Sequence, residues 1–89
     1  MHAHVIVSGR VQGVGFRFTA QQKAVQYNVN GWVQNKSDGT VELEVEGNDH
    51  QVNTFLNELK KGFNPAIKVE DMQVDTQQDE KGYRHFSIK

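Results

Sequence analysis

One short run of this sequence has the composition of an anion-binding loop, and it reads Gly9-Arg-Val-Gln-Gly-Val-Gly-Phe-Arg17. Its three glycines let the backbone adopt positive φ angles and bring N–H groups close to a ligand. The run follows an apolar segment, residues 5–7, and leads into a segment with helical character. Its free N–H groups and the positive end of the helix dipole would therefore point the same way. Arg17 adds a planar guanidinium that binds phosphate or carboxylate through two N–H groups. The run predicts a ligand that carries a phosphate.

The residue types alone also allow a simpler interpretation, which is a tight structural turn followed by a surface arginine. The run is not a Walker P-loop, because no Lys-Ser or Lys-Thr pair follows its last glycine. It is not a dinucleotide-binding fingerprint either, because Phe18 stands where that pattern needs its third glycine. Both interpretations stay open on the residues alone.

The elements that must position this run are predicted by hydrophobic spacing and by turn residues. A helix over 16–27 ends at Asn28, which tolerates the left-handed conformation. Asn48 and Gln51 have the spacing of a capping box for a second helix. The predicted order is a strand at 4–9, a helix at 16–27, strands at 31–36 and 40–46, a helix from Asn48 to Gly62, a strand at 66–75, a loop at 76–82 and a strand at 83–88.

This order predicts an α+β fold, a two-layer α/β sandwich of the ferredoxin-like type (βαββαβ). We expect an antiparallel sheet of four strands with a short extra edge strand, and both helices on one face of the sheet. Each helix would connect parallel, non-adjacent strands by a right-handed crossover. A chain of 89 residues is long enough for one domain, which we place at 1–89.

The strand at 40–46 alternates strictly between apolar and acidic side chains. We expect its apolar residues to face the core and its acidic residues to face solvent, namely Val41, Leu43 and Val45 against Glu42, Glu44 and Glu46. The apolar phase shifts between Val69 and Met72, which predicts a β-bulge near Glu70-Asp71.

Two large aromatic residues and two histidines near the N-terminus are more simply explained by structure than by function. Phe16 and Trp32 could line a substrate pocket, but we expect them to pack in the core, because large aromatic side chains dominate the cores of small domains. His2 and His4 share one face of a strand and could bind a metal, but a frayed chain end is the simpler interpretation.

In the predicted fold, the first strand and the first helix meet at a loop on one edge of the sandwich. The second strand runs beside that loop and carries Asn35. A carboxamide has both a donor and an acceptor, so it can hold a water molecule in one orientation. Arg17 and Asn35 around the glycine-rich run would bind a phosphoryl group and direct water toward it.

Two runs of this sequence resemble the two signatures of the acylphosphatase family. The first is Gly9–Arg17, and the second is Gly31-Trp-Val-Gln-Asn-Lys-Ser-Asp-Gly-Thr-Val41, ending at Gly47. They occur in order and at the spacing of that family, and the resemblance covers essentially the whole chain. The chain departs from the family at Phe18, where a tyrosine is common, and at Asn28, where a helix-ending glycine is usual. Neither departure affects the expected chemistry.

The resemblance implies hydrolysis of the carboxyl–phosphate bond of acyl phosphates to a carboxylate and inorganic phosphate, by attack of water without a covalent intermediate. It implies that Arg17 binds the phosphate and that Asn35 positions the water as catalytic residues. The backbone amides implied to bind the substrate phosphate are those of Gln12, Gly13, Val14, Gly15 and Phe16. We expect no metal and no cofactor, and we expect inorganic phosphate to be both product and competitive inhibitor of a small-molecule acyl phosphate substrate.

Composition narrows the range of partners. The formal net charge is −1 and the pI is near 6.4, which argues against a nucleic-acid surface. The absence of cysteine excludes disulfides, thiolate catalysis and zinc–sulfur sites. No apolar run approaches the roughly 20 residues that span a bilayer, and the N-terminus lacks the pattern of a signal peptide. We therefore expect a cytoplasmic monomer that binds neither nucleic acid nor membrane.

Three alternatives share this fold or this chemistry. An RNA-binding module has the same order of elements, but it stacks bases on aromatic side chains of strands, where this chain has Glu42, Glu44 and Glu46. A non-catalytic anion-binding domain would not need both Arg17 and Asn35. Carbamoyl phosphate is a further possible substrate, because a similar domain occurs inside larger carbamoyl-transferring maturation proteins.

Overall fold

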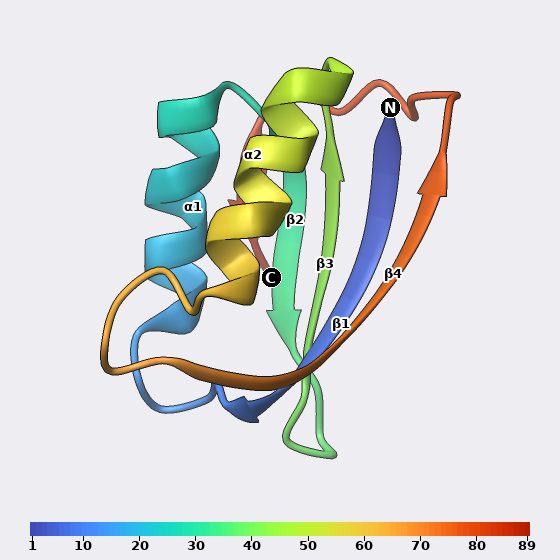
Figure 1. Cartoon of the computed structure of the whole chain (residues 1–89). Helices are drawn as coiled ribbons and strands as arrows, with labels where there is room; N and C mark the ends of the chain where they lie inside the picture. Colours follow the sequence, from blue (N-terminus) through green and yellow to red (C-terminus); the bar gives the residue numbers. More distant parts are fainter.

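A computed structural model describes residues 1–89 of the chain (Figure 1). Five strands and two helices follow in the order β1 (His2–Arg10), α1 (Phe16–Tyr27), β2 (Asn30–Asn35), β3 (Val41–Glu46), α2 (Asp49–Lys60), β4 (Lys68–Gln77) and β5 (Phe86–Ile88). Neither helix is both long and apolar enough to cross a membrane.

The five strands form one sheet in the order β4-β1-β3-β2-β5. All neighbouring strands are antiparallel except β2 and β5, which are parallel. Both helices lie side by side on one face of the sheet (Figure 1). The predicted ferredoxin-like sandwich is confirmed, and β5 is the predicted extra edge strand.

The crossover of α1 brings the ends of two strands to the same edge of the molecule. β1 and β2 run in the same direction with β3 between them. Consequently the loop that follows β1 and the hairpin that follows β2 lie at one edge, at the bottom of Figure 1. This edge carries both of the sequence runs that suggest chemistry.

Local sequence signals set the ends of the helices. Asn28 follows α1 in the left-handed conformation with φ 57°, as predicted. The Asn48 side chain accepts the Gln51 N–H at 2.8 Å, and the Gln51 side chain accepts the Asn48 N–H at 3.3 Å. This reciprocal pair is the predicted capping box, and it satisfies two N–H groups at the start of α2.

The core lies between the helices and the sheet and contains 18 buried apolar residues. Within this core, the ring of Phe55 on α2 contacts two other aromatic rings, with centroids 5.5 Å from that of Phe63 and 6.1 Å from that of Phe86. Phe16, at the start of α1, also contacts Phe63 in a tilted arrangement with ring centroids 5.8 Å apart, and it is buried as predicted. This packing fixes the first turn of α1 against the rest of the fold.

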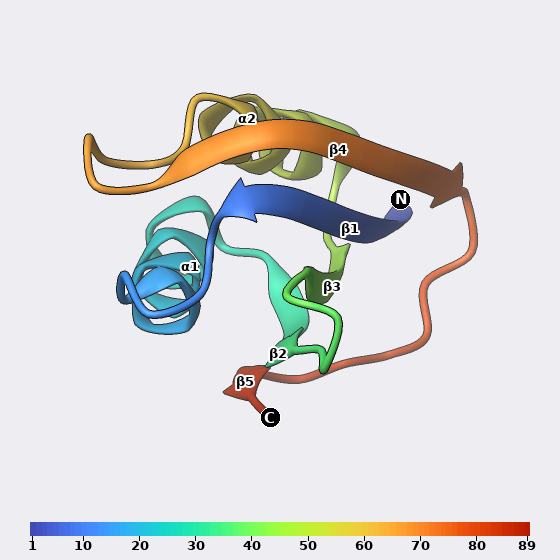
Figure 2. The same ribbon diagram turned by 90° about the horizontal axis from the view of Figure 1, so that it is seen from below.

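The prediction that the acidic face of β3 is solvated is wrong. Glu44 is only 8% exposed and Glu46 only 2%. Residues 78–85, which we call the cover segment, connect β4 to β5 along the side of the sheet away from the helices (Figure 2). Alternation in a strand indicates two faces, but it does not indicate what covers the second face.

Hydrogen bonds attach the cover segment to these carboxylates. Glu46 accepts three consecutive backbone N–H groups, from Lys81 at 2.7 Å, Gly82 at 2.8 Å and Tyr83 at 2.8 Å. Glu44 accepts the Tyr83 hydroxyl at 2.6 Å and the Lys81 ammonium at 3.1 Å. Both buried carboxylates are therefore hydrogen-bonded, and Glu44 is also ion-paired with Lys81, which lowers the cost of burying them.

The N-terminus is ordered against this same face, so the prediction of a frayed end is wrong. His2 is 2% exposed, and its Nε2 lies 3.0 Å from Oε1 of Glu44. His4 pairs with Glu42 at 2.6 Å. Backbone pairing with β3 and β4 on both sides places β1 near the centre of the sheet, and a central strand does not fray.

Trp32 is buried, but it does not belong to the core between the helices and the sheet. It lies on the covered face, where its Nε1 donates to the Tyr83 hydroxyl at 3.1 Å. The Lys89 ammonium lies 4.2 Å from the centre of its ring, in a cation–π contact. The indole N–H has its partner on this face, which accounts for the placement.

β4 contains the predicted bulge. Ser8 pairs with Asp71 and Gly9 pairs with Val69, so Glu70 is skipped in the ladder. β4 also continues to Gln77, although the sequence predicts a loop from residue 76. Backbone pairing with the first residues of β1 extends β4 to Gln77. The local sequence of residues 76–77 does not indicate this pairing.

Candidate active site

The loop between β1 and α1, residues 11–15, holds its backbone in the left-handed conformation at two positions. We call it the glycine loop. Gly13 has φ 73° and Gly15 has φ 75°. A Cβ added at either residue would meet no atom within 4 Å, so backbone conformation requires glycine here and close packing does not. Such turns direct successive N–H groups toward one side, where an anion can bind them.

The glycine loop and the first turn of α1 retain free N–H donors. The first hydrogen bond at the start of α1 runs from the Thr19 N–H to the Gly15 carbonyl at 3.0 Å. No side chain caps this helix end, and no acidic residue lies in its first turn. The first 37 residues of the chain contain four Lys or Arg and no Asp or Glu. Free donors, the helix dipole and the local charge all favour a bound anion.

The side chain of Gln12 fixes the glycine loop to the β2–β3 hairpin. Its Nε2 donates to the carbonyl of Lys36 and to the carbonyl of Thr40, each at 2.8 Å. The two bonds join the two sequence runs that suggest chemistry, and they set their relative position. Sequence reasoning assigned Gln12 a backbone role only, because nothing local names the partner of its side chain.

A cavity of about 260 Å³ lies beside the glycine loop, and both predicted catalytic side chains line it. Arg17 comes from the first turn of α1 and is exposed. Its Nη1 donates to the Lys89 carbonyl at 3.4 Å, and it takes part in none of the ion pairs of the chain. Its positive charge is therefore available to an anion in the cavity.

Asn35 enters the cavity from the last position of β2. Its Oδ1 is buried and has no hydrogen-bond partner in the protein. An unpaired buried acceptor costs about 1–3 kcal/mol, so it usually marks a functional group or a bound water. The side chain can accept a hydrogen bond from a water molecule held between β2 and the glycine loop.

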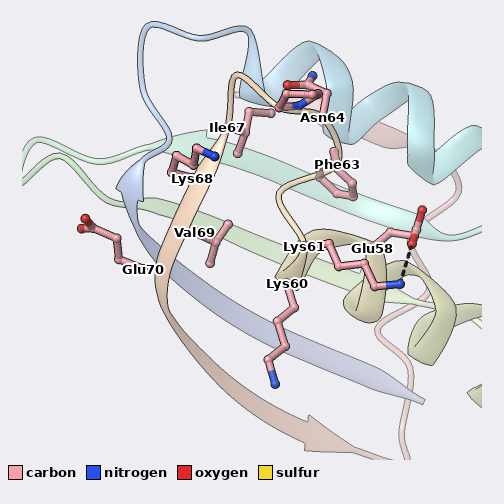
Figure 3. A pocket seen from close by; sticks show the side chains of 10 residues that line it. Glu58, Lys60, Lys61, Phe63, Asn64, Ile67, Lys68, Val69 and Glu70 are labelled. Carbon is pink, nitrogen blue, oxygen red and sulfur yellow. Dashed lines mark ion pairs between the residues drawn. The ribbon is translucent and has the colours of Figure 1, made fainter.

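The largest cavity of the molecule, about 670 Å³, is a different one and lies between the C-terminal end of α2 and the start of β4 (Figure 3). Three lysines line it, but Glu58 and Glu70 line it as well, and Lys61 already pairs with Glu58 at 3.8 Å. The negative end of the α2 dipole also disfavours an anion there. The smaller cavity at the glycine loop is therefore the better site for a phosphate.

The structure brings most of the predicted site residues together. Arg17, Asn35, Gly13, Gly15 and Phe16 line the cavity at the glycine loop. Gln12 and Val14 do not line it, and the Val14 side chain packs partly against the core.

Sequence reasoning missed three residues of this cavity, namely Val11, Phe18 and Ile88. The signal for Phe18 is an aromatic residue beside Arg17 and off the apolar stripe of α1. Ile88 could be found only by knowing that β5 pairs with β2, because their register places it opposite Val33.

Comparison with known proteins places this geometry in a family. The acylphosphatase family model matches residues 3–88. The chain belongs to the acylphosphatase family. An acylphosphatase of Bacillus pumilus is 46% identical over 89 residues, which is the whole chain and 98% of that relative. The crystal structure of an acylphosphatase from Bacillus subtilis superposes with a TM-score of 0.93 at 40% identity, covering 99% of this chain and 97% of that one. The predicted resemblance is confirmed.

The same fold also occurs inside a much larger protein. Full-length HypF, in its phosphate- and nucleotide-bound form, matches 99% of this chain with a TM-score of 0.87 and 32% identity. The match covers only 11% of the HypF chain. The acylphosphatase fold therefore occurs both as a chain of about this length and as one part of a larger protein.

Proposed function

We propose that this chain hydrolyses the carboxyl–phosphate bond of acyl phosphates in the cavity beside Arg17 and Asn35. One observation carries the proposal. A guanidinium without an acidic partner, a buried carboxamide oxygen without a partner and a loop with free N–H donors all meet at one cavity. These are the groups needed to bind a phosphoryl group and to direct water at it.

The guanidinium of Arg17 and the backbone N–H groups of Gly13, Gly15 and Phe16, which line the cavity, bind the non-bridging oxygens of the substrate phosphate. Phosphoryl transfer depends mainly on positioning and on stabilising the charge that spreads over these oxygens. Donors fixed in advance by a folded loop stabilise that charge without reorganising during the reaction. The two hydrogen bonds of the Gln12 side chain fix the loop in this way.

The carboxamide oxygen of Asn35 accepts a hydrogen bond from the attacking water and aims its oxygen at phosphorus. The water oxygen forms the new bond to phosphorus while the bond from phosphorus to the acyl oxygen breaks. The acyl group leaves as a carboxylate with the electron pair of that bond. Because a carboxylic acid has a low pKa, this leaving group needs no general acid.

The proton of the attacking water passes to an oxygen of the transferring phosphate. No Asp, Glu or His side chain lines the cavity, so the chain offers no general base there. The products are one carboxylate and one inorganic phosphate. Inorganic phosphate would bind the same donors and would therefore inhibit competitively.

The experiment that tests this proposal is hydrolysis of benzoyl phosphate in ¹⁸O-water with a metal chelator present. We expect turnover to survive the chelator and the label to appear in inorganic phosphate. Label in benzoate would mean attack at the carbonyl carbon, and the proposed role of Asn35 would then be wrong. Loss of turnover with the chelator would contradict the metal-free mechanism.

We further propose that the chain is a single-domain cytoplasmic monomer, and sedimentation would test the oligomeric state. Carbamoyl phosphate is worth including in the substrate panel because it contains the same carboxyl–phosphate linkage. The RNA-binding alternative loses support, because the cover segment occupies the sheet face on which bases would stack.

A further inference from the structure

Two of the exposed large apolar side chains of this protein flank its phosphate site. Phe18 is 60% exposed and Ile88 is 41% exposed. Both line the cavity that contains Arg17 and Asn35. The other two exposed large apolar residues, Val25 and Val74, lie away from this cavity.

The fold explains why these two side chains stay outside the core. On α1 the buried residues are Phe16, Ala20 and Ala24, so Phe18 projects from a different side of the helix. On β5, Phe86 and Ile88 share one face, but only Phe86 belongs to the buried core. Ile88 pairs in register with Val33, two positions before Asn35 on the same face of β2.

Both residues are adjacent in the chain to groups of the phosphate site. Phe18 directly follows Arg17, and Ile88 directly precedes Lys89, whose carbonyl accepts the Arg17 guanidinium. The cavity, at about 260 Å³, exceeds the space of a phosphoryl group, which takes up roughly that of two or three waters at about 30 Å³ each. The remaining space has one aromatic and one aliphatic wall.

We propose that Phe18 and Ile88 bind the acyl group of the substrate and select acyl phosphates with an apolar acyl group. This inference rests on the proposed function. The phosphate held by the glycine loop and Arg17 fixes one end of the substrate, and the acyl group extends from it along the two apolar side chains. Covering exposed apolar surface is favourable for such a group and offers nothing to a small or charged one.

The test compares benzoyl phosphate with acetyl phosphate, which share the reacting bond and differ in apolar surface. Parent, Phe18→Ala, Ile88→Ala and the control Val25→Ala are assayed for kcat and KM on both substrates. We expect the ratio of the two kcat/KM values to favour benzoyl phosphate in the parent. It should fall about tenfold in Phe18→Ala, the effect of uncovering roughly half a phenylalanine side chain. Ile88→Ala should lower the ratio less, and Val25→Ala should leave it unchanged.

The fall should appear in KM rather than kcat, because a contact to the acyl group is made equally before and during the reaction. The inhibition constant of inorganic phosphate, which has no acyl group, should stay at the parent value in each variant. Circular dichroism checks that each variant is folded, and Phe18→Leu, which keeps apolar surface, should recover part of the ratio.

Three outcomes would overturn the inference. The parent could treat both substrates alike, Val25→Ala could lower the ratio as much as Phe18→Ala, or sedimentation could show a dimer that Phe18→Ala dissociates. In the last case a second copy of the chain occupies the apolar surface. Absence of turnover on every acyl phosphate would instead contradict the proposed function itself.

Discussion

Two regions of this molecule use the same backbone device in opposite ways. In the cover segment, the N–H groups of Lys81, Gly82 and Tyr83 converge on the Glu46 carboxylate, with Gly82 left-handed at φ 86°. In the glycine loop, Gly13 and Gly15 are left-handed as well, but no carboxylate of the chain meets the N–H groups. The first arrangement is complete within the chain, and the second leaves its N–H groups available to a ligand.

The distribution of charge along the sequence accounts for this difference. All acidic residues lie at or after Asp38, so none precedes or follows the glycine loop closely. An internal carboxylate turns converging N–H groups into a structural contact. Without one, the same groups stay available for binding, and the protein bears the cost of leaving them free.

Arg17→Ala should have the largest effect of the variants that separate the two regions. It removes the charged donor beside the glycine loop, so kcat/KM on benzoyl phosphate should fall by about 10³-fold or more. Urea unfolding should show a free energy within about 0.5 kcal/mol of the parent, because Arg17 is exposed and makes one long hydrogen bond. Arg17→Lys keeps the charge without the planar fork and should recover only part of the activity. Unchanged kcat/KM in Arg17→Ala would place the phosphate elsewhere.

Asn35→Ala should have the next largest effect and should act on kcat. Loss of the group that orients water should lower kcat about 10²–10³-fold. Competitive inhibition by inorganic phosphate should persist, because the phosphate donors remain. The free energy of unfolding should not fall, since the substitution removes a buried acceptor that has no partner. If phosphate inhibition disappeared together with kcat, Asn35 would be a phosphate ligand and not a water-positioning residue.

Glu46→Gln, which weakens the contact of β3 with the cover segment, should lower the stability of the protein and leave its activity almost unchanged. A carboxamide has one acceptor oxygen, whereas Glu46 uses both carboxylate oxygens for three N–H groups. We expect a loss of about 2–4 kcal/mol in the free energy of unfolding, measured in urea. Turnover by the folded fraction should stay close to that of the parent. Glu42→Gln, at a half-buried position of the same strand, is the matched control and should cost less. An equal cost in both variants would show that the three N–H contacts contribute little.

The smallest expected effect is a pH dependence that belongs to Glu44. Burial raises the pKa of Glu44, but hydrogen bonds from Tyr83, His2 and Lys81 outweigh burial and lower the pKa from 4.5 to about 2. A pKa depressed by folding adds stability above the unfolded pKa, and that stability is lost as pH falls toward the folded value. The parent should therefore lose about 2 kcal/mol between pH 5 and pH 2 through this group. Urea unfolding of Glu44→Gln over that range should show a shallower pH dependence, and an identical slope would contradict the assignment.

Local patterns in the sequence predicted much of the fold because their causes are local. The bounds of α1, the left-handed Asn28 and the capping box of Asn48 and Gln51 depend on residues within one turn of each other. The bulge at Glu70 was visible as a change in apolar phase. The run from Gly9 to Arg17 also predicts an anion site, because free N–H groups and glycine conformation are properties of the segment itself.

Only the tertiary structure decided which distant groups meet. Strand order and register set the attachment of the Gln12 side chain to the β2–β3 hairpin and the apolar walls formed by Phe18 and Ile88. The approach of Asn35 to the run that ends at Arg17 was predicted, but only through the expected fold. The burial of Glu44 and Glu46 likewise depends on where a segment 35 or more residues later crosses the sheet. Sequence spacing fixes which face a side chain takes, because that is a property of one strand or helix. What covers the face, or completes a site on it, depends on packing between elements that no local pattern encodes.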